Sequence, residues 1–237
     1  MKRFYKKATP TKSTAGYEIL LDGKPVKLPS GKPLTCSSES VANEVAAEWN
    51  NQADIVKPDA MPLTQILTTA LERTGAERPV LTQQVLNYLN TDLIFYMAED
   101  EGVSAPHAKA QEKNWRKWIK YFSDMSKSEL VTTTGLAAIK QPDEIHVYVN
   151  ERINAMDDMY FTLLQILTAE TGSLLLSLAF LEGQMDTKQL FEATFVDDLV
   201  KADIHHADTY GHDPHTEKKW AEFKALTAAC EICLKST

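Results

Sequence analysis

The sequence is poor in the features that mark secreted and membrane-anchored proteins. It has three cysteines among 237 residues, too few for a disulfide framework. Residues 1–17 contain no apolar stretch as long as the core of a signal peptide. We therefore expect a reducing compartment: the bacterial cytoplasm or, in a eukaryote, the mitochondrial matrix after removal of a presequence. The formal charge of −8 argues against a protein that coats nucleic acid or an anionic membrane.

Sequence motifs of the common enzyme classes are also missing. No two of the nine glycines are two residues apart, so there is no dinucleotide-binding G-x-G-x-x-G loop. P-loop, H-E-x-x-H and G-x-S-x-G patterns do not occur either. These absences remove the enzyme classes that carry such motifs, but they do not exclude an enzyme.

Charge and proline content change along the chain. Residues 1–36 hold eight basic and two acidic residues and four of the ten prolines, whereas the remainder is strongly acidic. A change of this kind marks a domain boundary. We predict an α+β protein with a small β-rich N-terminal domain and one covering helix at 1–59, followed by an all-helical domain at 60–237.

Strand and turn signals dominate the beginning of the chain. Residues 17–21 alternate as a strand does, and Asp22-Gly23 is a hairpin turn signal. Residues 25–29 form the predicted return strand, and residues 3–6 add another by alternation. A sheet this small needs a cover.

A helix over residues 38–52 is the predicted cover for this sheet. Val41, Val45 and Trp49 recur every four residues, which places them on one face, and Ser37 or Ser38 can cap the start of the helix. We expect Trp49 to be buried and structural.

From residue 63 onward the apolar pattern is helical almost throughout, with a helix expected to stop at Gly75. Asp186 and Gln189 have capping-box spacing. Residues 159–181 are long enough to span a bilayer, but they include Glu170 and several hydroxyl side chains. We expect a buried central helix there and no membrane insertion.

Two groups of residues could carry chemistry. Cys230 and Cys233 form a C-x-x-C pair, but near the end of a helix, where the dipole does not stabilise a thiolate; buried packing is favoured. Residues 205–215 contain four histidines and two aspartates, yet Gly211 and Pro214 make the stretch a loop without fixed ligand spacing. We favour a loop without metal.

The order of landmarks along the chain carries a resemblance to a known family. The landmarks are Arg3-Phe4-Tyr5-Lys6, Leu21-Asp22-Gly23-Lys24-Pro25-Val26, Glu48-Trp49, Met61-Pro62-Leu63-Thr64 and Tyr88-Leu89-Asn90-Thr91-Asp92. This series resembles the ATP12 family of assembly chaperones for the F-type ATP synthase. The resemblance implies a non-enzyme without cofactor that binds the free alpha subunit of the catalytic sector before alpha–beta assembly. The expected partner is this protein client, and we expect a monomer.

A client surface is expected where acids gather near the last two long helices. Burying unpaired carboxylates is costly, so these acids belong at the surface. The predicted partner-binding residues are Asp197, Asp198, Asp213 and Glu217, with Phe195 and Leu199 as apolar neighbours.

Two alternatives stay open at this point. One is a metal-dependent enzyme centred on the histidine-rich loop 205–215. The other is a general helical scaffold that binds many partners.

Overall fold

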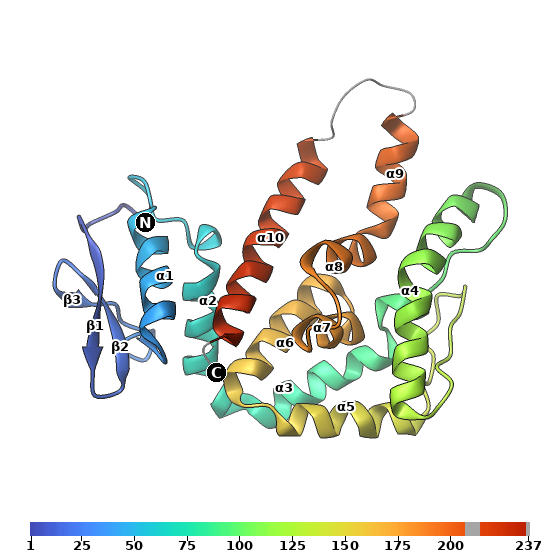
Figure 1. The fold of residues 1–237 in the computed structure, drawn as a ribbon, viewed down its shortest axis with the longest axis horizontal. Helices are drawn as coiled ribbons and strands as arrows, with labels where there is room; N and C mark the ends of the chain where they lie inside the picture. The colour runs from blue at the N-terminus through green and yellow to red at the C-terminus, as the bar shows by residue number, and fades with distance from the viewer. Residues whose placement is uncertain (207–213, 236–237) are drawn as a thin grey trace. The chain divides into compact units, whose positions relative to one another are not determined.

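The computed structural model describes residues 1–206 and 214–235, apart from the side chains of residues 204–206. A small antiparallel sheet comes first and helices follow, which confirms the predicted α+β class (Figure 1). Contacts divide the chain into two compact units. Unit 1 comprises Met1–Arg78, Asp157–Leu163 and Ala225–Thr237, and unit 2 comprises Pro79–Met156 and Leu164–Lys224. The division into folding domains at 1–59 and 60–237 stays a prediction.

The sheet of unit 1 is built around β2. Strand β1 (Ala8–Ser13) pairs antiparallel with β2 (Gly16–Leu21). The short strands β3 (Lys24–Pro25) and β4 (Thr35–Cys36) also pair antiparallel with β2. Asp22 and Gly23 have φ angles of 47° and 84°, so the Asp-Gly turn lies where it was predicted.

The strand predicted over residues 3–6 is wrong, because side chains bond to the backbone there. The carboxylate of Asp22 accepts from the N–H groups of Lys6 and Lys7, each at 2.9 Å. The guanidinium of Arg3 donates to the carbonyls of Tyr5 and Asn50, at 3.1 and 3.2 Å. These contacts satisfy the backbone without a ladder, and the first strand begins at Ala8.

Helix α1 (Glu39–Asn50) lies against the sheet (Figure 1). The Ser38 hydroxyl accepts from the Val41 N–H at 3.3 Å, as expected of an N-cap. Trp49 is 9% exposed, and its ring lies 5.7 Å from that of Tyr5. The Tyr5 hydroxyl donates to the Trp49 carbonyl at 2.6 Å. Trp49 thus lies in the core of unit 1.

Glu48 joins α1 to the start of α2 (Pro62–Thr69). Its carboxylate accepts from the N–H groups of Leu63 at 2.7 Å and Thr64 at 2.9 Å, which have no partner within α2. Burial raises the pKa of Glu48, and the hydrogen bonds from Thr64 and Leu63 partly oppose this. The glutamate thereby acts as a cap supplied by another helix.

The helix stop predicted at Gly75 is wrong. The chain passes from α2 through a π-helical turn (Ala70–Thr74) into α3 (Gly75–Asn87). A Cβ atom at Gly75 would lie 2.9 Å from Oδ2 of Asp158. Gly75 therefore allows close approach to the start of α6 and does not end a helix.

The remaining helices account for most of unit 2. Three short 3-10 turns precede them, at Tyr88–Asn90, Leu93–Phe95 and Gly102–Ser104. The remaining helices themselves are α4 (Ala105–Ser126), α5 (Asp143–Ala155), α6 (Asp158–Thr171), α7 (Leu174–Leu181), α8 (Thr187–Thr194), α9 (Val196–His206) and α10 (Pro214–Leu234). In the part of the chain that is described, none of the helices combines the length and apolarity needed to cross a bilayer.

The stretch 159–181, expected to be one helix, forms two. Gly172 has a φ of 67° just after α6 ends, and the Ser173 hydroxyl accepts from the Leu176 N–H at 3.0 Å to cap α7. Further along the chain, a break in the helical backbone at Phe195 separates α8 from α9. The capping box of Asp186 and Gln189 at the start of α8 is confirmed.

A buried carboxylate holds the start of α7, whose residues are all buried. Asp92 accepts from the N–H of Leu175 at 3.1 Å and from that of Ile94 at 3.3 Å. Burial raises its pKa to about 6, although hydrogen bonds from Ser173 and the nearby backbone oppose the rise. Asp92 thereby connects the 3-10 turn Leu93–Phe95, which it precedes, to α7, the most apolar helix.

Replacing Trp49 with arginine should destabilise the protein by about 3–5 kcal/mol, because it removes a buried ring and puts a charge in its place. Trp49→Phe is the matched control. Since the indole nitrogen has no hydrogen-bond partner in the described part of the chain, this variant should lose only about 1 kcal/mol. Urea unfolding measures both. Equal stability of Trp49→Arg and wild type would show that the site tolerates charge and is not structural.

Asp92 should make stability depend on pH between about 4 and 6. Its pKa is about 6 when folded against 3.8 for an unperturbed carboxyl, so the folded state retains the proton longer. The free energy of unfolding should therefore fall by about 3 kcal/mol as pH rises through this window. Asp92→Asn cannot titrate, so the difference between wild type and variant isolates the effect. A difference that is constant from pH 4 to 6 would contradict it.

Candidate functional site

Aromatic rings form a cluster where α8, α9 and α10 meet within unit 2. The ring of Phe191 lies 4.9 Å from those of Phe195 and Trp220, and Phe195 lies 5.5 Å from Phe223. Phe223 is 2% exposed, whereas Phe195 and Trp220 are half-buried. The cluster therefore has a buried base and a partly accessible edge.

Asp198 stands beside this edge. Its carboxylate accepts from Nζ of Lys219 at 2.7 Å, and the same Nζ lies 4.6 Å from the ring centroid of Phe195. The hydrogen bond from Lys219 lowers the pKa of Asp198. Because the Asp198 side chain remains 48% exposed, it can still attract a cation from solution. The structure thus brings the predicted residues Phe195 and Asp198 together.

Asp197 points to a different neighbour. It lies 2.8 Å from Nδ1 of His107 and accepts from the Gln111 amide at 2.9 Å, and both partners belong to α4. Gln111 is itself buried and accepts from the Ala98 N–H at 2.6 Å. The sequence gives no sign of this network, which fixes α9 against α4. The Asp197 carboxylate thus contacts two side chains within unit 2, whereas that of Asp198 contacts Lys219.

The other predicted contact residues are distributed as follows. Leu199 is half-buried on α9, and Glu217 is exposed in the first turn of α10. Asp213 lies outside the described residues, as does most of the histidine-rich loop 205–215. The name α9–α10 surface is used below for Phe195, Asp198 and Leu199, at the start of α9, together with Glu217 in the first turn of α10.

The described residues offer no obvious reactive centre. No group of three or more histidine, cysteine or acidic side chains among them could hold a metal ion. All three cysteines are free and buried. Burial raises the pKa of Cys36 to about 12 and that of Cys233 to about 11, and also raises that of Cys230. Protonated thiols of this kind are poor nucleophiles, which favours the packing role predicted for the C-x-x-C pair.

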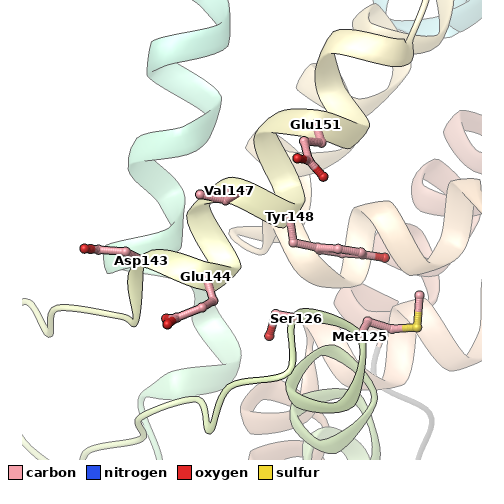
Figure 2. Close-up of a pocket in the computed structure, with 7 residues that line it drawn as sticks. All are labelled: Met125, Ser126, Asp143, Glu144, Val147, Tyr148 and Glu151. Carbon is pink, nitrogen blue, oxygen red and sulfur yellow. The ribbon is translucent and has the colours of Figure 1, made fainter.

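A hollow of about 430 Å³ lies between the end of α4 and the first turns of α5. Figure 2 shows Met125 and Ser126 on the α4 side, with the Tyr148 side chain reaching from α5 toward the end of α4. The α5 side is completed by Val147 and three acids, Asp143, Glu144 and Glu151. We call this feature the α4–α5 hollow. It was not predicted from the sequence.

These features define a class of protein before any relative is considered. A helical protein that carries acidic side chains beside exposed apolar ones is suited to binding another protein. Comparison with known families then places it: the chain belongs to the ATP12 chaperone protein family, whose model matches residues 2–123. The predicted resemblance is confirmed, and the chain is a chaperone of the class that assists ATP synthase assembly.

Individual relatives agree with this family. The chain is 24% identical over 198 residues to the mitochondrial protein atp12 of Schizosaccharomyces pombe. The aligned region covers 79% of this chain and 68% of the relative. The crystal structure of Atp12 from Paracoccus denitrificans superposes with a TM-score of 0.78 at 24% identity, covering 100% of this chain and 98% of the other. The Atu1473 protein of Agrobacterium tumefaciens gives a TM-score of 0.82 at 25% identity, with 99% and 85% covered.

Proposed function

We propose that this chain binds the free alpha subunit of the F-type ATP synthase and keeps it competent for assembly with the beta subunit. It acts by covering a surface, without catalysing a reaction and without a cofactor or metal. A free subunit exposes apolar area that its neighbours later bury, and this area promotes aggregation until it is covered. The observation that carries the proposal is the α9–α10 surface, combined with membership of a chaperone family.

The chemistry of the α9–α10 surface suits reversible capture. Asp198 and Glu217 supply negative charge, which steers a basic patch on a client and sets the association rate. The accessible edge of Phe195, with Leu199 beside it on α9, offers a limited apolar contact, which supplies affinity. A small apolar area within a charged rim allows the beta subunit to displace the chaperone.

The two alternatives have less support. A general scaffold would bind unrelated helical proteins, whereas membership of a family of assembly chaperones favours a dedicated client. The metal-dependent enzyme would depend on the histidine-rich loop, most of which lies outside the described residues. We propose that the protein works as a monomer in the compartment where the alpha subunit is made or imported, the bacterial cytoplasm or the mitochondrial matrix, and that it contacts neither nucleic acid nor membrane.

Charge reversal on the α9–α10 surface tests the proposal. The double variant Asp198→Lys, Glu217→Lys should weaken binding of purified alpha subunit about tenfold or more at low salt, and less at about 0.15 M salt, where screening already removes part of the attraction. Fluorescence anisotropy with labelled alpha subunit measures the Kd at both salt concentrations. Loss of the surface ion pair with Lys219 should cost no more than about 1 kcal/mol of stability.

The matched control is Asp54→Lys, Asp59→Lys, which makes the same change in net charge at two exposed positions of unit 1. It should bind within about twofold of wild type at equal salt. If the α9–α10 double variant binds like this control at both salt concentrations, the client contacts another surface.

A further inference from the structure

One face of helix α5 packs in the core of unit 2, and an exposed valine lies outside that face. Ile145, Val149 and Ile153 recur every four residues and are each 0% exposed. Val147 lies on the opposite side of the helix and is 57% exposed. Tyr148 is half-buried, and its ring lies 6.5 Å from that of Phe122. Val147 and Met125 both line the α4–α5 hollow and together offer exposed apolar surface that the core of unit 2 does not use.

The hollow is formed by two elements, α4 and α5. Met125, 44% exposed, and Ser126 come from the last turn of α4 and form the opposite side. The volume of about 430 Å³ falls within the range of about 300–1,000 Å³ typical of binding pockets and accommodates a large apolar side chain. Methionine is flexible and adapts to differently shaped partners, which suits a client-binding position.

Negative charge borders the hollow on the α5 side. Glu144 and Glu151 are seven residues apart, with Val147 and Tyr148 between them, so all four share one helical face. Asp143 and Glu144 lie in the first turn of α5, where the helix dipole stabilises negative charge. Glu151 is too far along α5 for the dipole to explain its position. Lys140 lies 3.5 Å from Asp143. Among the described residues no ion pair joins a cation to Glu144 or Glu151.

We propose that the α4–α5 hollow receives one large apolar side chain of a basic amphipathic helix of the client. The charges decide the occupant: the apolar side chain enters between Met125 and Val147, and lysine or arginine residues one turn on either side face Glu144 and Glu151. Lys127 follows Ser126 on the α4 side, so the basic residues of the occupant lie toward α5. This inference rests on the proposed function only in assigning the helix to the alpha subunit.

The first measurement uses a probe that does not depend on the client. A labelled 18-residue amphipathic helix of leucine and lysine is titrated with the full-length protein, and fluorescence anisotropy gives the Kd. Glu144→Lys, Glu151→Lys should raise this Kd at least about tenfold, and Val147→Asp should do the same by placing a polar group at the opening of the hollow. Both changes are at exposed positions, and thermal unfolding verifies the fold.

The control for charge is Glu99→Lys, Glu101→Lys, two exposed acids that precede the opposite end of α4. This variant should bind the peptide within about twofold of wild type. Equal affinity of wild type, the Glu144/Glu151 double variant and Val147→Asp, or no binding by wild type, would overturn the assignment of the hollow.

Competition with unlabelled alpha subunit separates the two proposals. Displacement of the peptide by the alpha subunit supports the client assignment. If the alpha subunit binds wild type without displacing the peptide, the hollow binds basic helices but the client does not use it. If the alpha subunit does not bind wild type at all, the proposed function and the client assignment both fail, while the peptide measurement still decides what the hollow binds.

Discussion

Buried helix starts need hydrogen-bond acceptors, and this need constrains the rest of the structure. The first N–H groups of a helix have no partner within it, and in an apolar core water cannot supply one. Asp92 meets this need for α7, and Glu48 meets it for α2. Each carboxylate comes from another part of the chain, so it fixes where the helix begins and what lies beside it. The raised pKa of each shows that burial opposes its charge while the hydrogen bonds support it.

Because such carboxylates hold helices in place, other helix faces need not pack in the core. The α9–α10 surface and the α4–α5 hollow both lie in unit 2, and both combine acids with a small apolar area. Such surfaces stay solvated when empty, because charge surrounds the apolar part. They offer a basic client several weak contacts, which suits a chaperone that must later release its client to an assembly partner.

Local sequence signals predicted the elements that depend on near neighbours. The Asp22-Gly23 turn, a serine cap at the start of α1 and the buried face of α1 follow from residues at most a few positions apart. Long-range contacts explain what was missed. Strand β1 contains Pro10 and mostly polar residues, and it forms by pairing with β2. Asp197 looked like a surface acid because its partner Gln111 is 86 residues away. The hollow was missed because Val147 on α5 and Met125 on α4 come together only in the folded chain.

The central claim is selective binding of the free alpha subunit. The most direct measurement is equilibrium binding of the full-length protein to alpha and beta subunits that have been expressed and purified separately. The account predicts a one-to-one complex with the alpha subunit, no complex with the beta subunit at the same concentration, and release of the alpha subunit when the beta subunit is added. Equal binding to both subunits, or to neither, would contradict it.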